Sequence, residues 1–289
     1  MLQDTLDMLA PIGILSLGFF SLYEWVNGKY KNGKKTKEDW KMAGICLAAL
    51  VFVQRPLLML VVFWLMSVLF PEGQGVYHWI DVEYFGIGVV LFIVVDEFFH
   101  GGAHLFSHSS RPKNKVLRSI QSFVKAAHRP HHFSGGNDNK GELNVTQTYV
   151  EGWGWAFILP NYIIGLMVLY LGMYKIFLVG TAIKSLWALH NHCNWNYDLY
   201  LLNHRNVVVR KVMYGICHVF TFPTMHQQHH SRGKNSAKNM QNMLSIFDWL
   251  LWKTLVIENK RPEIFGWRQN EVEERSVLYR FLNSGIKTT

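Results

Sequence analysis

The chain has 289 residues, of which 49% are hydrophobic, 15% aromatic and only 17% charged. Soluble domains carry about 25% charged residues, so this composition argues against a wholly soluble protein. The three cysteines, Cys46, Cys193 and Cys217, form no Cys-x-x-Cys motif. Their spacing excludes a zinc finger, an iron–sulfur site and a disulfide framework.

Five hydrophobic segments predict a bundle of membrane helices, at residues 8–26, 42–70, 84–99, 155–170 and 174–189. The second segment is interrupted by Gln54, Arg55 and Pro56, which predicts a kink or a short hairpin. The last two are near the lower limit for a span, about 17 residues, and we expect them to form a tight hairpin. The predicted fold is an all-α integral membrane helical bundle with about four to five transmembrane segments, in one domain over residues 1–289.

Charge placement predicts how the bundle is oriented. Residues 29–41 contain six lysines and residues 111–129 contain six Lys or Arg, whereas residues 71–83 contain three acidic residues and no Lys or Arg. The positive-inside rule places the two basic segments in the cytoplasm. Because the basic residues flank membrane segments, topology and anionic lipid explain the net charge of +9 better than nucleic-acid binding does. The host membrane is the endoplasmic reticulum in a eukaryote or the inner membrane in a bacterium.

Nine of the fourteen histidines fall into three short clusters. Two clusters share the form His-x-x-His-His, and the third has a spacing of four residues. On a helix, both spacings place imidazoles on one face, and neutral imidazole binds iron, zinc, copper or nickel. Crowded imidazoles repel one another or lose solvation unless they share a partner, so more than one metal ion is predicted. The clusters are His100, His104 and His108; His128, His131 and His132; and His226, His229 and His230.

The predicted topology collects all three clusters, together with His190 and His192, at the cytoplasmic end of the bundle. His78 lies alone on the opposite side and is excluded from the site. We therefore expect a histidine-rich helical cap whose active site faces the cytoplasm. Cys193 adjoins His192, and we interpret it as a bystander in an all-imidazole site.

The clusters, in this order between paired spans, resemble the fatty acid hydroxylase superfamily, which includes sterol desaturases, C4-sterol methyl oxidases and sphingolipid hydroxylases. The resemblance covers a catalytic region over residues 96–254. It is strongest at residues 223–231, Pro-Thr-Met-His-Gln-Gln-His-His-Ser, and at residues 239–254. Met240-Gln241 stands where the family commonly has Tyr-Gly, and Trp252-Lys253 where it has Phe-Gly. These departures leave the histidines intact but weaken assignment to a subfamily.

The resemblance implies a set of ten metal ligands: His104, His108, His128, His131, His132, His190, His192, His226, His229 and His230. Two alternatives stay open, since His100 can replace His108 as the partner of His104, and His204 is a weaker rival of His192. Four polar residues are expected to support the ligands, with the two acids orienting imidazoles through their N–H groups: Asp96, Glu97, Asn194 and Asn239.

The resemblance also implies a membrane-bound non-haem diiron oxygenase that uses two iron ions and O₂ to hydroxylate or desaturate a lipid or sterol-like substrate. An unactivated C–H bond offers neither an acidic proton nor a leaving group, so a metal–oxygen reagent suits this chemistry. The sequence contains no cytochrome b5 haem motif and no nucleotide-binding loop. A separate electron donor is therefore expected, such as cytochrome b5 or ferredoxin with its reductase.

Two alternatives belong to other functional classes. A zinc-dependent membrane hydrolase would use histidines to activate water and would need a general base such as Glu142 or Glu151. A metal-binding membrane transporter would place its ligands at the middle of the membrane.

Overall fold

The computed structural model describes residues 2–133, 140–266 and 281. Within these ranges the regular elements are helices, and the one β-bridge pairs Ser231 with Phe265. The predicted all-α class is confirmed. The α-helices are α1 (Leu2–Val26), α2 (Lys37–Ala49), α3 (Arg55–Leu69), α4 (His78–Glu83), α5 (Phe85–His108), α6 (Lys115–His128), α7 (Trp155–Ile158), α8 (Pro160–Tyr170), α9 (Tyr174–His192), α10 (Tyr197–Leu202), α11 (Val207–Ile216) and α12 (Pro223–His229).

Shorter turns of helix join several of these elements. Two are π-helical, η1 (Leu50–Gln54) and η5 (Asp248–Trp252). Three are 3₁₀ turns: η2 (Pro71–Gly73), η3 (Arg129–His132) and η4 (Val145–Tyr149).

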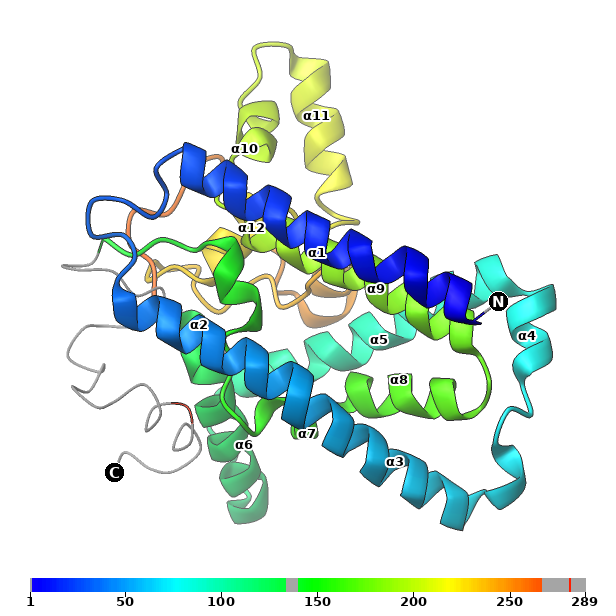
Figure 1. Ribbon diagram of the computed structural model, residues 1–289. Coiled ribbons are helices and arrows are strands. Elements are labelled where there is room, and N and C mark those ends of the chain that lie inside the picture. The colour runs from blue at the N-terminus through cyan, green and yellow to red at the C-terminus, as the bar shows by residue number, and fades with distance from the viewer. Residues whose placement is uncertain (1, 134–139, 267–280, 282–289) are drawn as a thin grey trace.

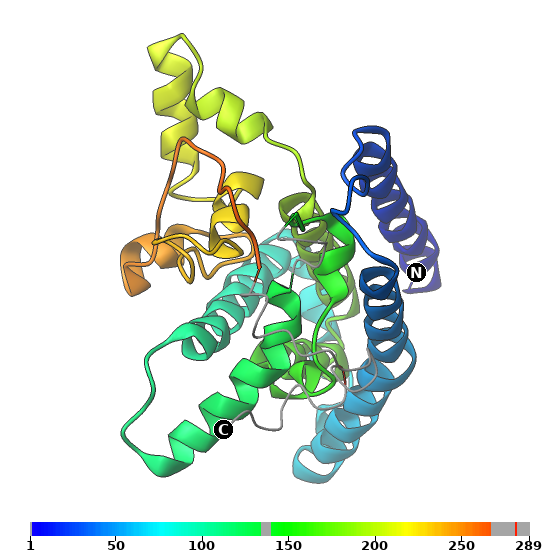
Figure 2. The same cartoon turned by 90° about the vertical axis from the view of Figure 1, so that its left-hand side faces the viewer.

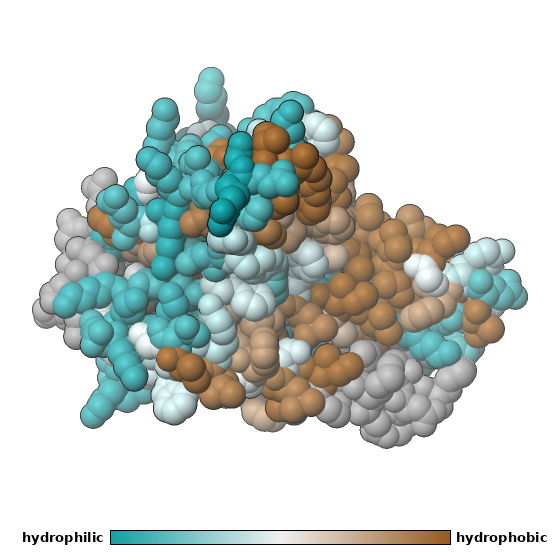
Figure 3. Space-filling view, turned by 90° about the horizontal axis from the view of Figure 1, so that it is seen from above, coloured by the Kyte–Doolittle hydropathy of each residue, from teal (hydrophilic) through white to brown (hydrophobic). Residues whose placement is uncertain are grey.

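The long helices run roughly along one direction, whereas α6, α10 and α11 project away from that direction (Figure 1). Seen from above, hydrophilic residues gather towards one end and hydrophobic residues towards the other (Figure 3). Among the described residues, two helices are long and apolar enough to cross a membrane, Lys37–Leu69 and Phe85–His108. The apolar stretches Ile12–Val26 and Pro160–Tyr170 are shorter.

The interruption at residues 54–56 is a local irregularity within one long helix and not a hairpin. The backbone N–H of Arg55 donates to the carbonyl of Leu50, which gives the wide π turn η1. Pro56 then occupies the first turn of α3. A proline removes one hydrogen bond from a helix and crowds the preceding turn, and a π turn absorbs such a disturbance without ending the helix.

Close packing between α5 and α9 sets the frame of the bundle. A Cβ atom built on Gly180 of α9 would lie 2.3 Å from Cδ1 of Phe92 on α5. In the same way, a Cβ on Gly88 of α5 would lie 2.3 Å from Cδ1 of Ile176 on α9. Small residues let helix backbones approach closely, and here they bring the C-terminal ends of α5 and α9 to the polar end of the molecule.

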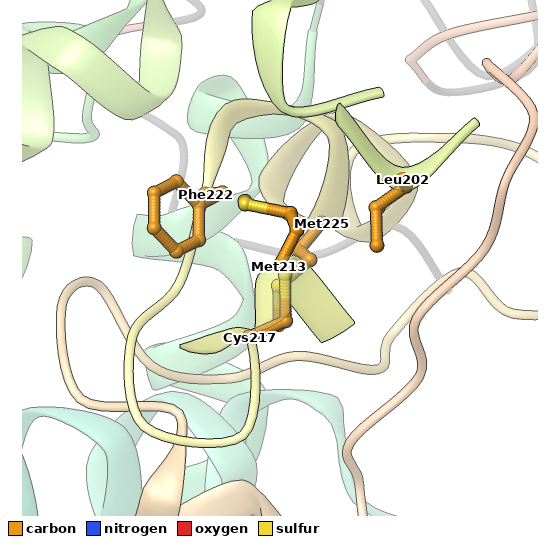
Figure 4. Packing of buried hydrophobic residues seen from close by; sticks show 5 residues of the cluster. All are labelled: Leu202, Met213, Cys217, Phe222 and Met225. Carbon is orange, nitrogen blue, oxygen red and sulfur yellow. The ribbon is translucent and has the colours of Figure 1, made fainter. Parts of the chain in front are cut away.

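Helix α12 is anchored by a small hydrophobic core. Its residue Met225 and the preceding Phe222 pack with Leu202 of α10 and with Met213 and Cys217 (Figure 4). A view onto the polar end shows the segment from α12 to residue 266 beside the ends of the long helices (Figure 2). Helix α12, which carries part of the third histidine cluster, also contacts α9.

We predict that Gly180→Ala weakens the bundle. The new methyl group would force Phe92 to move, and overpacking of this kind costs about 1–3 kcal/mol. Thermal unfolding in detergent should show a lower midpoint than that of the wild type. The matched control is Gly86→Ala on α5, where no atom lies within 4 Å of the added Cβ. If both variants unfold at the wild-type midpoint, α5 and α9 do not pack as described.

Candidate metal centre

Nine histidines meet in two neighbouring groups at the polar end of the bundle. Within each group, the nitrogen atoms available as ligands lie within 4.8 Å of one another. The first group contains His104, His108, His128, His132 and His229, and the second contains His131, His192, His226 and His230. We call these the first group and the second group.

Each His-x-x-His-His motif contributes to both groups. In the motif at residues 128–132, His128 and His132 belong to the first group and His131 to the second. In the motif at residues 226–230, His229 belongs to the first group, and the other two histidines belong to the second. In the earlier motif, α6 ends at His128 and the chain tightens into the 3₁₀ turn η3. In the later motif, His226 and His229 both lie on α12.

Backbone carbonyls fix the protonation of three of these rings. Nδ1 of His104 lies 2.7 Å from the carbonyl oxygen of Met240, and Nδ1 of His229 lies 2.7 Å from that of Lys238. Nδ1 of His192 lies 2.8 Å from the carbonyl oxygen of Ala188. A carbonyl only accepts, so each Nδ1 carries the proton and each Nε2 presents a lone pair.

Nε2 atoms of other histidines crowd around these lone pairs. Nε2 of His192 lies 3.1 Å from Nε2 of both His131 and His226, and Nε2 of His229 lies 3.2 Å from Nε2 of His132. Nε2 of His104 and of His108 is buried and has no hydrogen-bond partner. An unsatisfied buried polar atom costs about 1–3 kcal/mol, and a cation among the rings would remove that cost. The donor set therefore fits metal ions.

The buried environment keeps the imidazoles neutral. Burial, reinforced by neighbouring rings, lowers the pKa of His128, His132 and His226 well below 6.5. Burial also lowers the pKa of His229 to about 4. Neutral imidazole is the form that coordinates a metal, so the rings are ready to bind at neutral pH.

The sequence model of the fatty acid hydroxylase family matches residues 88–252. The chain belongs to the fatty acid hydroxylase family. All nine grouped histidines lie within the matched range. The family consists of oxidoreductases that act on lipids, and it is associated with membranes. Comparisons with curated proteins and with solved structures gave no match.

The structure separates the alternative ligands of this fatty acid hydroxylase family member. It groups His108 with His104, whereas His100 lies outside both groups with its ring 5.8 Å from that of His104. It groups His192 and leaves out His204, whose Nδ1 accepts from the backbone N–H of Asn206.

His190 and His78 also lie outside the groups. His190 has its Nε2 2.7 Å from the hydroxyl of Tyr197 and its Nδ1 3.0 Å from the side-chain oxygen of Asn191. His78 contacts Gly172 and Tyr174 at the turn between α8 and α9.

The acids of α5 bind a lysine. Asp96 is paired with Lys184 of α9 and accepts from Asn161. Glu97 lies 2.9 Å from the Lys184 ammonium and accepts the backbone N–H groups of residues 243 and 244. The sequence predicted that these acids orient imidazoles, but it gave no sign that Lys184 is buried against them. A buried ammonium requires a carboxylate partner, and this pairing ties α9 to α5 near the ligands.

Asn239 and Asn194 brace the loops beside the histidines. Asn239 exchanges hydrogen bonds with the backbone of Val256 and donates to the carbonyl of Met225. It lies between residues 238 and 240, whose carbonyls orient two ligands. The Asn194 side chain contacts Glu142 and Arg261, and its backbone N–H donates to Glu24.

Sequence reasoning missed the role of Asp248. Its carboxylate accepts the backbone N–H groups of Met240 and Gln241 and the hydroxyl of Thr254. These bonds hold the carbonyl that orients His104. The motif at residues 239–254 contains Asp248, but nothing in its spacing shows which loop the carboxylate supports.

A cavity of about 170 Å³ reaches the first group. Its lining includes His108, His128 and His132, together with Ser107, Lys125 and Arg129. A small molecule in this cavity would lie directly against the imidazoles of the first group.

Proposed function

We propose that this protein is a membrane-bound non-haem diiron oxygenase that hydroxylates or desaturates a lipid or sterol-like substrate. The observation that carries the proposal is the pair of neighbouring groups of buried histidines, whose nitrogens converge. The five histidines of the first group and the four of the second would each hold one iron ion. When bound, the two irons would supply the O₂ chemistry that an unactivated C–H bond requires.

The chain's own groups would prepare this centre. The carbonyls of Met240, Lys238 and Ala188 hold three imidazoles in the ligand tautomer. Burial excludes water and keeps the rings unprotonated. The cavity beside His108 and His132 offers a route by which substrate or O₂ would approach the first group.

A zinc hydrolase is less well supported. A catalytic zinc ion uses three protein ligands and one water, whereas nine imidazoles converge here. Burial alone would raise the pKa of Glu142, but Lys34 and Arg261 hold it at about 2. A carboxylate held so firmly by two cations is a poor general base at neutral pH, so a hydrolase would depend on Glu151, which lies against two of the histidines.

A transporter is also less well supported. Transporters place polar ligands on broken helices at the middle of the membrane. Here His104, His108 and His192 lie in the last turns of α5 and α9.

For the proposed oxygenase, electrons would come to this end of the bundle from a separate protein, such as cytochrome b5 or ferredoxin with its reductase.

We further propose that the bundle spans a membrane four to five times, with the histidines at its cytoplasmic surface. Two helices that project from the bundle, α6 and α11, support this placement (Figure 1). Both contain basic residues and no acidic residue. The first half of α6 exposes Val116, Leu117 and Ile120. Basic amphipathic helices of this kind lie in the membrane interface. The membrane surface would then lie close to the first histidine group.

We predict that a spin label at Leu117→Cys enters the interface in lipid nanodiscs, because the apolar face of α6 would rest on lipid. Accessibility to dissolved oxygen and to a water-soluble nickel complex measures the depth. The matched control is Ser122→Cys, which is exposed on the same helix and should stay accessible to nickel. Equal nickel accessibility at both positions would contradict the interfacial placement.

We predict that replacing His131, His132, His229 or His230 with Ala abolishes oxidation without preventing membrane insertion, because each loss opens the coordination of one ion. Lipid mass spectrometry of expressing cells should lose the product that gains one oxygen or loses two hydrogens. His78→Ala should retain the product. Full turnover by one of the four variants would remove that residue from the ligand set.

A further inference from the structure

Glu151 lies between the two histidine groups, in the loop that joins η4 to α7. Its Oε2 atom is 3.4 Å from Nδ1 of His128, and its Oε1 atom is 3.3 Å from Nδ1 of His131. His128 belongs to the first group and His131 to the second. One carboxylate therefore contacts one member of each group.

Glu151 contacts the Nδ1 atom of each ring, which leaves Nε2 available to a metal ion. Nε2 of His128 faces Nε2 of His132 at 3.0 Å, and Nε2 of His131 faces Nε2 of His192 at 3.1 Å. The two Nδ1 atoms point away from these nitrogens. Neither has a hydrogen-bond partner among the described residues, and the carboxylate oxygens of Glu151 lie within ion-pair distance of both. Both rings thus have one nitrogen for a metal and one for Glu151.

The fold holds this carboxylate in place. The carbonyl of Glu151 accepts from Sγ of Cys46 at 3.2 Å, and the next residue, Gly152, donates its N–H to the carbonyl of Ala127 at 2.7 Å. The ring of Trp155 stacks on that of His128 at 4.4 Å. Within the described part of the chain, no lysine or arginine is paired with Glu151.

We propose that Glu151 is a positioning residue that couples the two metal sites, an inference that rests on the proposed diiron function. It accepts the Nδ1–H of both histidines and keeps both in the tautomer that leaves Nε2 free. Carboxylate partners of this kind orient a ligand imidazole and raise its basicity. The carbonyls of Met240, Lys238 and Ala188 each serve one histidine and carry no net charge, whereas Glu151 contacts two. Burial raises the pKa of Glu151, and two bound cations would hold its carboxylate ionised.

The test is Glu151→Gln, which keeps the size of the side chain. The amide has one accepting oxygen in place of two and no charge, so one histidine loses its acceptor and both ions lose the nearby anion. Loss of such a partner weakens metal binding by about 10- to 100-fold. Competition with a chelator for iron, on purified protein in nanodiscs, should show weaker binding of both ions. A redox titration followed by EPR should show a more positive reduction potential, because the negative charge no longer stabilises the oxidised ions.

The matched control is Glu142→Gln. Glu142 is a half-buried carboxylate in the same part of the chain, and its partners are Lys34, Arg261 and Asn194. This variant should keep the wild-type iron affinity and potential. Circular dichroism of both metal-free variants shows whether they fold.

Three results would overturn the inference: unchanged affinity and potential in Glu151→Gln, loss of one ion with the other unaffected, or the same loss in Glu142→Gln. Each of these results presupposes a wild-type protein with two irons, so the proposed function would survive it. A wild-type protein that binds no iron would instead overturn the proposed function itself.

Discussion

The structure depends on an unusual electrostatic arrangement, in which unprotonated imidazole nitrogens face one another inside the protein. In water such rings would be solvated or protonated. Here burial removes the water, and the carbonyls of Met240, Lys238 and Ala188 fix the proton on the opposite nitrogen. Neutral imidazole nitrogens about 3 Å apart suit a shared cation, and a metal ion is the cation that imidazole binds. The packing of α5 against α9 and the bracing by Asp248 and Asn239 keep the nitrogens converged.

Much of this site could be predicted from the sequence because it depends on local spacing. The four-residue repeat of His104 and His108 places both rings on one face of α5, as the helical period requires. The split within each His-x-x-His-His motif could not be predicted in this way. In the first motif, α6 gives way to a 3₁₀ turn after His128. In the second, α12 continues to His229, and tertiary contacts decide which group each ring joins. The partners of Asp96 and Glu151 are tertiary contacts from distant helices and loops, so no local pattern reports them.

The membrane segments show a similar limit. Hydropathy identifies Lys37–Leu69 and Phe85–His108 because they are long, apolar and poor in charged residues. Helix α9 contains Lys184 and two histidines, which lower its hydropathy. Its neighbours are α1, α5, α8 and α12, so protein rather than lipid surrounds much of it. A helix in that position can carry polar groups that pair inside the bundle, so the hydropathy of α9 as a whole falls although residues 174–189 form a hydrophobic segment.

The most direct measurement is anomalous X-ray scattering at the iron edge, from crystals of protein purified without oxygen. The account predicts two iron peaks, one among His104, His108, His128, His132 and His229 and the other among His131, His192, His226 and His230. A single peak, a peak outside these groups, or scattering from zinc in place of iron would contradict it.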